Sequence, residues 1–476
     1  MKRDAELACA AAFAALGLLL LWPVLDGGFF ADDWELWLAH PAQHLASAFG
    51  EVRPFGTYRP IQLALVAGSQ ALWPGTTVPV HVLNLALHVA LCVGIARALA
   101  GFGAPLAGAV LGGTYAAVSQ LAASAVGGND TISLTLGTCA GFGALACLRP
   151  FEPERKARPA LAALSFAVAL FAKESSVGFL PLLAAAAWWR WGRGSRDLHR
   201  LVSWLGAFCA ITAVYLAVRQ RAGGAAPDLM NNRFVHVGPH MLGNAALLGF
   251  AAVVPVSTTR VYLGALAHRW LWPAAGALSA FAWLAFAVWG MRRAGRLALL
   301  GAFAAAALVL FVPVLPLVHV SELYAYGALP LAALAFGWSS GALLQRGSRA
   351  ERAAALAFAL FVLAANAWAA REDALGMAKS GREAAALMPQ LVEELRALPP
   401  DGTAVLVDPP LDVPNYSVFQ VSGFRGVLVS RQAARELSGR SDVDLVGLAP
   451  GEPRPEPCSG CVFFELASGN RIAPMP

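Results

Sequence analysis

Two adjacent carboxylates, Asp32 and Asp33, follow the first apolar stretch of the chain, residues 7–25. They stand where a membrane helix would emerge from the bilayer, and charge so close to lipid is costly. A carboxylate in such a place can act as a general base toward a hydroxyl group. The alternative is that the pair only begins a solvated loop, and position alone does not decide between the two.

Further polar segments lie beside later apolar stretches, and their side chains are of types that bind anions, move protons or form hydrogen bonds. They are Tyr58-Arg59-Pro60, the helix-like run with His81, Asn84 and His88, the segment Gly127–Asp130, the pair Lys173-Glu174, the polar stretch with Asp228, Arg233 and His236, and the segment from His319 through Glu322 and Tyr324 to Tyr326.

The composition is that of a membrane protein. Hydrophobic residues make up 58% of the 476 residues and charged residues only 13%, against about 25% charged in soluble domains. The apolar residues are grouped into runs of about 20, the length that crosses a hydrocarbon core. We therefore expect an all-α polytopic membrane protein. The first stretch lacks a small-residue cleavage site before the acidic pair, so we interpret it as an uncleaved first helix rather than a signal peptide.

Hydropathy predicts about eleven membrane helices. We expect them near residues 7–25, 79–99, 104–121, 129–148, 159–172, 175–190, 201–218, 270–290, 297–317, 327–344 and 353–370. Short arginine-rich loops after several of these stretches predict a cytoplasmic side, and they fall on one side only if residues 241–256 do not cross fully. The net charge of +6 is dispersed over these loops without interleaved aromatic residues, so it does not indicate nucleic-acid binding.

Residues 1–370 are thus predicted to form the membrane domain, with a long first exterior loop at 26–78, and residues 371–476 a small soluble α/β domain on the exterior side. Within the latter, periodicity predicts a separate amphipathic helix at 383–398 and strands at 403–407 and 424–430. Cys458 and Cys461 are interpreted as a local disulfide, with free thiols or a metal or redox pair as alternatives.

The order of these segments resembles the GT-C superfamily of membrane glycosyltransferases, above all the protein O-mannosyltransferase-related, TMTC-type and ArnT-like proteins. Those proteins show an acidic pair after the first helix, a later Arg-Pro, a helix with Asn and His one turn apart, a Gly-x-x-Asp segment, a Lys-Glu pair and a Glu-Arg-Tyr-x-Tyr segment. The resemblance covers roughly residues 25–340 and departs from the pattern at Leu323, where the family has arginine.

The resemblance implies a transferase that moves a sugar from a polyprenyl-phosphate donor to a protein, lipid or glycan acceptor at the exterior membrane face. The Ala-, Arg- and Gly-rich composition indicates a bacterium, so we expect the protein in the inner membrane with this face in the periplasm. The residues fit such chemistry independently. Asp32 or Asp33 could be the base, with Asp130 as a further catalytic carboxylate, while Arg59, Lys173 and Arg233 could hold the leaving phosphate. The candidate binding residues are Arg59, His81, Asn84, His88, Lys173, Glu174, Arg233, Glu322, Tyr324 and Tyr326. No cofactor is required, and a divalent ion such as Mg²⁺ or Mn²⁺ between Asp33 and Asp130 stays open.

Each site residue also has a structural interpretation. Asp130 could cap the following helix, Lys173-Glu174 could be a neutralising pair, Asn84 and His88 could form interhelical hydrogen bonds, and the tyrosines could belong to an interfacial belt. Two rival functions remain. A transporter or flippase predicts internal repeats and ionisable residues near the bilayer midplane, whereas the charges here lie near span ends. A catalytically inactive lipid-binding relative predicts that substitution of Asp32 or Asp33 has no effect.

Overall fold

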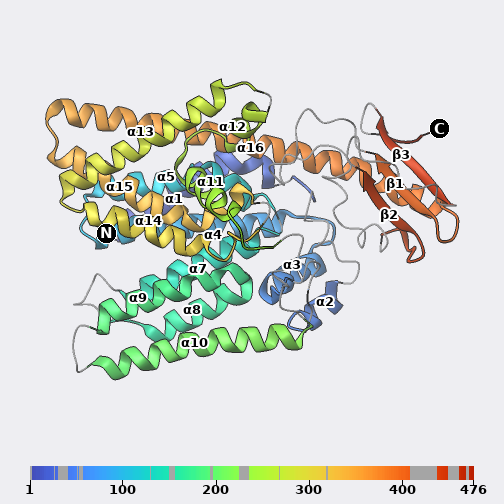
Figure 1. The fold of residues 1–476 in the computed structure, drawn as a ribbon, viewed down its shortest axis with the longest axis horizontal. Helices are drawn as coiled ribbons and strands as arrows, with labels where there is room; N and C mark the ends of the chain where they lie inside the picture. The colour runs from blue at the N-terminus through green and yellow to red at the C-terminus, as the bar shows by residue number, and fades with distance from the viewer. Residues whose placement is uncertain are drawn as a thin grey trace.

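The computed structural model describes residues 3–25, 27–29, 41–50, 52, 57–128, 130–149, 156–192, 197–223, 235–266, 268–317, 320–407, 437–448, 460–467 and 471–475. Most of the chain is helical, and a small sheet lies at one end of the helix bundle (Figure 1). The helices of the first half are α1 (Arg3–Leu25), α2 (Pro41–Ser47), α3 (Pro60–Leu72), α4 (Val78–Gly101), α5 (Leu106–Ala117), α6 (Gln120–Val126), α7 (Ile132–Leu148), α8 (Pro159–Ala172) and α9 (Phe179–Trp191). Those of the second half are α10 (Leu198–Arg221), α11 (His240–Val253), α12 (Thr258–Leu266), α13 (Leu271–Ala294), α14 (Leu297–Phe311), α15 (Leu329–Arg346) and α16 (Arg349–Ala397).

The described helices make this a multi-pass membrane protein. Six of them are long and apolar enough to cross a bilayer, or seven if α5 and α6 together form one broken span. Five further apolar helices have 10–17 residues. A helix lies near each of the eleven predicted stretches, but by length only six or seven of them qualify as full crossings, so the expected number of eleven is not confirmed.

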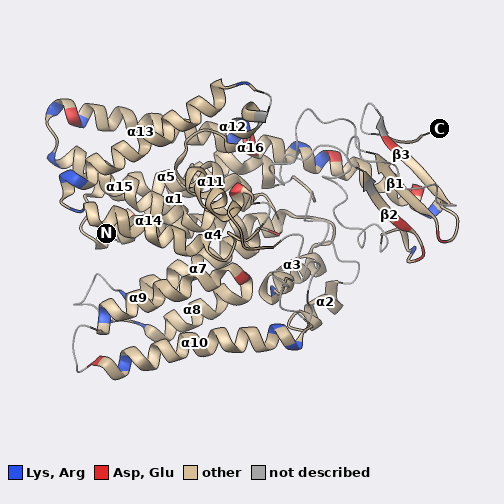
Figure 2. Cartoon of the chain, viewed as in Figure 1, with Lys and Arg blue, Asp and Glu red and all other residues tan. Residues whose placement is uncertain are grey.

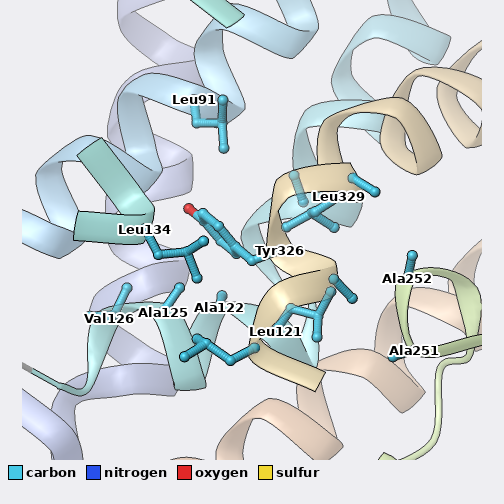
Figure 3. Packing of buried hydrophobic residues seen from close by; sticks show 14 of the residues in the cluster. Leu91, Leu121, Ala122, Ala125, Val126, Leu134, Ala251, Ala252, Tyr326 and Leu329 are labelled. Carbon is cyan, nitrogen blue, oxygen red and sulfur yellow. The ribbon is translucent and has the colours of Figure 1, made fainter. Parts of the chain in front are cut away.

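Helix α15 is the centre of the bundle, and its side chains are buried from Leu329 to Leu343. Glycines let α5 approach it closely: a Cβ added at Gly337 would lie 2.5 Å from the carbonyl oxygen of Gly108. Such small-residue contacts are how helices associate in lipid, where apolar burial gives no advantage. Tyr326, just before α15, is fully buried among apolar side chains that include Leu134 (Figure 3), so the belt interpretation is wrong for this tyrosine.

Two predicted spans are interrupted. The stretch expected at 104–121 divides into α5 and α6, which are bent by 53°. Ser119 has extended dihedral angles at this break, and its side chain accepts a hydrogen bond from Leu121 N. The stretch expected at 175–190 begins with a 3-10 helix, η3 (Glu174–Gly178), before α9. A second 3-10 helix, η5 (Glu322–Ala328), leads into α15. These breaks place polar residues at the ends of apolar helices.

The predicted separate helix at 383–398 is also wrong, because α16 is continuous over 49 residues despite Pro389. At 1.5 Å per residue it is about 74 Å long, far more than the roughly 30 Å of a hydrocarbon core. The capping box of Ser348 and Glu351 begins it, and its far end reaches the sheet (Figure 1).

The sheet has the strand order β2-β1-β3-β4. Strand β1 (Thr403–Val407) lies where it was predicted and pairs in parallel with β2 (Asp444–Leu448) and β3 (Cys461–Ala467), while β4 (Arg471–Pro474) is antiparallel to β3. Gln390 on α16 accepts a hydrogen bond from Ile472 N, which joins the helix to the sheet. The strand predicted at 424–430 lies outside the described residues. Cys461 is disulfide-bonded, and its predicted partner Cys458 is also outside them.

The charges are distributed unevenly along the bundle. Lys and Arg gather at the end where the N-terminus lies, at the turn from α13 to α14, the turn from α15 to α16, the end of α9 and the start of α10, while the last turn of α10, with Arg219 and Arg221, lies at the opposite end (Figure 2). Near the opposite end, toward the sheet, charges of both signs occur around α3, α7 and α16 (Figure 2). The candidate site lies among these mixed charges.

Candidate functional site

Arg59 is the centre of a charged network that joins three distant segments. Its Nε and Nη2 donate to the two carboxylate oxygens of Glu174, both at 2.7 Å, and its Nη1 donates to Asp130 Oδ1 at 3.3 Å. The Arg59 side chain is only 11% exposed. A guanidinium has five N–H bonds, of which three donate to described residues and two have no acceptor among them.

The local sequence explains why Arg59 is held in this place. It is the N-cap residue of α3, and Pro60 at the first helical position fixes the backbone there. Tyr58, which is fully buried, donates its hydroxyl to Phe49 O and accepts at its backbone carbonyl from the Tyr215 hydroxyl of α10. Helix α8 adds Phe171, whose ring meets the Tyr215 ring edge-on at 5.3 Å. An aromatic support thus surrounds the backbone that carries Arg59.

Gln62 binds Asp130 from the first turn of the same helix. Its Nε2 donates to the backbone carbonyl of Asp130 at 2.7 Å and to Oδ1 at 2.8 Å. The N-cap of α7 is Thr131 and makes no side-chain capping bond, so Asp130 is not simply the cap of that helix. Sequence reasoning missed Gln62; a signal was available in its position two residues after the proline at a helix start.

Lys173 and Glu174 do not simply neutralise one another. Lys173 ends α8, is 4% exposed, and places its Nζ 3.5 Å from Ser133 Oγ and 5.8 Å from the centre of the Tyr324 ring. Glu174 begins η3 and binds Arg59 instead. The two residues therefore extend the network from Arg59 toward η5, and the four ionisable groups Arg59, Asp130, Lys173 and Glu174 balance in formal charge.

Asn84 on α4 supports the turn that carries Asp130. Its Nδ2 donates to Gly128 O at 2.9 Å and to Val126 O at 3.3 Å, and its Oδ1 accepts from the Thr135 hydroxyl at 2.6 Å. It is fully buried. The interhelical interpretation of Asn84 is therefore confirmed, and through it the residue contributes to the site by holding Asp130 in position.

His88 lies one turn further along α4 and joins this helix to η5. Its Nδ1 is 2.9 Å from the Tyr326 hydroxyl, again an interhelical contact. His81, one turn before Asn84, has its Nδ1 2.7 Å from Val24 O at the end of α1 and is fully buried. Helix α4 therefore aligns three segments that bear candidate residues: the exit of α1, the Asp130 turn and η5.

Glu322 is 6% exposed and lies at the start of η5, which Ser321 caps. Leu323, which departs from the pattern of the proteins that the sequence resembles, is buried against the hydrophobic core. On α16, Glu372 forms an ion pair with Arg260 of α12, and Asp373 Oδ1 accepts from the Ser257 hydroxyl at 3.4 Å. This group of charges on α12 and α16 was not found from the sequence.

The predicted residues Asp32, Asp33, Arg233 and His319 lie outside the described residues. The backbone that leads to the acidic pair is described up to Phe29, and α16 contacts it directly. A Cβ added at Gly381 would lie 1.6 Å from the carbonyl oxygen of Gly27, and Gly28 adopts a left-handed conformation with φ of +74°. Only glycine at residue 381 permits this approach to Gly27, which lies five residues before Asp32.

The electrostatics of the Arg59 network follow from its pairing. Burial alone would raise the pKa of Glu174, but the charge of Arg59 and its two hydrogen bonds outweigh burial and lower that pKa to about 2. Burial would likewise lower the pKa of Arg59, whereas the charges of Glu174 and Asp130 raise it above its ordinary value. Both groups are therefore ionised at neutral pH.

The part of the chain that the structure describes contains no group of three or more His, Cys, Asp and Glu side chains that could hold a metal ion. The Asp130 Oδ1 atom is engaged by Arg59 and Gln62, which makes it a poor ligand for Mg²⁺ or Mn²⁺ in this arrangement. Asp33, the other predicted ligand, lies outside the described residues.

The arrangement of the helices is shared with a solved structure. The chain is similar to the crystal structure of ArnT from Cupriavidus metallidurans in the apo state, with a TM-score of 0.53 and 14% identity over 93% of this chain and 86% of ArnT. At this identity the similarity establishes the fold alone. The chain also matches the apo oligosaccharyltransferase of Archaeoglobus fulgidus, with a TM-score of 0.44 and 13% identity over 85% of this chain and 62% of that protein. No protein-family model and no curated protein matches the sequence.

Proposed function

We propose that the protein is an integral-membrane glycosyltransferase that moves a sugar from a polyprenyl-phosphate donor to a protein, lipid or glycan acceptor. The observation that carries the proposal is the meeting of Arg59, Asp130 and Glu174, from segments up to 115 residues apart, with Lys173 beside them, on an ArnT-like fold. Arg59 and Lys173 place two cationic groups in this network, and a leaving phosphate is a ligand that such groups suit.

In this proposal Asp32 or Asp33 takes the proton from the acceptor hydroxyl as its oxygen attacks the anomeric carbon. The bond between that carbon and the phosphate oxygen breaks, and the electron pair leaves with the polyprenyl phosphate. Lys173, together with the two remaining N–H bonds of Arg59, stabilises the phosphate charge. Asp130 and Glu174 keep Arg59 oriented, and Asn84 and Gln62 keep Asp130 in place.

We further propose that the protein lies in a bacterial inner membrane with the site and the domain 371–476 in the periplasm. The concentration of Lys and Arg at the other end of the bundle (Figure 2) supports this orientation through the positive-inside rule. The orientation is tested by labelling single cysteines in whole cells with a membrane-impermeant thiol reagent. We expect labelling near Thr76 but not near Gly347, and the opposite result would show that the orientation is the reverse.

The test of function is release of polyprenyl phosphate by purified protein in lipid nanodiscs, supplied with polyprenyl-phosphate mannose or glucose and a native membrane extract. Lys173→Met is expected to lower kcat/KM at least about 100-fold, the scale of a lost stabilising group. Lys379→Met is the matched control, because Lys379 is exposed on α16 and its ion pair among the described residues is with Glu383 at 3.7 Å. A parallel measurement with a chelator shows whether the transfer requires a metal ion. Equal activity of both variants would contradict the phosphate role of Lys173.

A further inference from the structure

Gln62 has an amide whose two ends have different surroundings. The side chain is fully buried on the first turn of α3. Its Nε2 donates to two acceptors of Asp130, the backbone carbonyl at 2.7 Å and Oδ1 at 2.8 Å. Because both partners are acceptors, they determine the orientation of the amide: the nitrogen faces Asp130 and Oε1 faces away.

The Oε1 atom of Gln62 is enclosed and has no hydrogen-bond partner in the described part of the chain. A buried acceptor without a donor costs about 1–3 kcal/mol, and such groups are rare enough in native proteins to need an explanation. Here the atom belongs to the same helical turn as Arg59, and both side chains bind Asp130 Oδ1. The unused acceptor is therefore part of the charged network rather than of a remote core.

The chemistry of an amide oxygen restricts its ligand. It accepts hydrogen bonds, so it suits a hydroxyl group and disfavours the anionic oxygens of a phosphate. Next to cations that suit a phosphate, an acceptor for a hydroxyl suggests that one substrate carries both groups, or that two substrates meet at this point. A polyprenyl-phosphate sugar has both.

We propose that Gln62 Oε1 accepts a hydrogen bond from a hydroxyl group of a bound substrate and so selects for that hydroxyl. The inference rests on the proposed function and adds a specificity residue to it. The hydroxyl belongs either to the transferred sugar or to the acceptor. Because Oε1 is covered when no substrate is bound, the side chains around it rearrange on binding.

The test measures discrimination rather than activity alone. The kcat/KM values of wild-type protein are compared for polyprenyl-phosphate mannose or glucose and for each single-deoxy analogue, and then for acceptors with and without single hydroxyl groups. A site built to bind a hydroxyl rejects the analogue that lacks it by orders of magnitude, so we expect a preference of about 100-fold or more at one position. In Gln62→Met that preference is expected to fall below about 10-fold, and the series in which it falls identifies the source of the hydroxyl.

Gln70→Met is the matched control. Gln70 lies two turns further along the same helix and is 5% exposed, so the same substitution there removes a buried amide without touching Asp130. It is expected to keep the wild-type preference. Gln62→Asn keeps both amide atoms but shortens the side chain by one methylene, so we expect a preference between those of the wild type and Gln62→Met. This variant replaces Gln62→Met in the test if the methionine variant does not fold.

Two failures can be told apart. If wild-type protein releases no polyprenyl phosphate from any donor, the proposed function is wrong and this inference falls with it. If wild-type protein is active but Gln62→Met and Gln62→Asn keep the wild-type preference at every position, Oε1 binds only water and the inference alone is wrong.

Discussion

Removal of the negative charge of Glu174 is the perturbation that tests the charged network most sharply. Glu174→Gln keeps the shape of the side chain but replaces one of the two acceptors of Arg59 with a donor. Arg59, 11% exposed, then keeps one neutral acceptor at residue 174, and Asp130 at 3.3 Å is its one carboxylate partner among the described residues. Unpairing a fully buried ion pair costs about 3–5 kcal/mol, and an exposed pair contributes about 0.2–1 kcal/mol. Because the Glu174 side chain is 33% exposed, we expect a value between these limits, about 2 kcal/mol.

The measurement is the free energy of unfolding from an equilibrium denaturant titration in detergent micelles. Asp197→Asn is the matched control, because Asp197 pairs with Arg200 at 3.2 Å while the two side chains are 43% and 60% exposed. It is expected to change stability by less than about 1 kcal/mol. If both variants lose the same small amount, the Arg59 network does not stabilise this end of the bundle and the reasoning is refuted.

The same pair predicts a dependence on pH. The pKa of Glu174 is about 2 in the folded chain against an ordinary 4.5, so the unfolded chain takes up a proton first as the pH falls. The contribution of Glu174 to stability is therefore complete above pH 4.5 and is lost progressively between pH 4.5 and 2. Stability of the wild type should decline more steeply in that window than that of Glu174→Gln, and parallel curves would contradict the assignment.

Three further substitutions probe the supports of the site. Gly337→Ala would place a methyl 2.5 Å from a backbone carbonyl oxygen of α5, and we expect a loss of about 1–3 kcal/mol in the same titration. Gly206→Ala on α10, where a Cβ meets nothing within 4 Å, should change stability by less than about 1 kcal/mol. Gly381→Ala would displace the chain that leads to the acidic pair, so kcat should fall about 100-fold in folded protein while Gly206→Ala stays near wild type. Asn84→Leu should cost about 1–3 kcal/mol and lower transfer, since it releases the turn of Asp130; unchanged activity would assign Asn84 to packing alone.

Regular apolar helices with clear boundaries were predictable from the sequence. The expected helix at 159–172 coincides with α8 (Pro159–Ala172), because a proline begins it and the charged pair after it ends the apolar run. Strand β1 (Thr403–Val407) coincides in the same way, since β-branched residues stand between turn-forming ones. Local signals were sufficient in both places.

Other elements depend on contacts that local patterns do not contain. Helix α3 was missed because its 13 residues are too few for a span and include buried amides such as Gln62. Helix α16 was divided in the prediction because its apolar character changes after Trp368, yet the helix continues past this point and through Pro389. Hydropathy reports where lipid ends but does not report where a helix ends.

The candidate site was predictable as a set of residue types but not as a network. The order of polar segments drew attention to Arg59, Asp130, Lys173 and Glu174, and the structure brings these together. The pairing of Arg59 with Glu174, 115 residues away, requires knowledge of how α3 and α8 pack. Gln62 was missed because its one local signal, its place in the first turn after Pro60, predicts a helix start and does not predict the contact with Asp130.

The central claim is that the protein transfers a sugar with a carboxylate of the Asp32–Asp33 pair as the base. The most direct measurement compares release of polyprenyl phosphate by wild-type protein, Asp32→Asn and Asp33→Asn in nanodiscs, with polyprenyl-phosphate mannose or glucose and native membrane extract, with and without chelator. The account predicts release by the wild type that is lost in one of the two variants. Equal release by all three proteins would show that neither Asp32 nor Asp33 is the base. No release from folded wild-type protein with any donor would favour a transporter or an inactive lipid-binding relative.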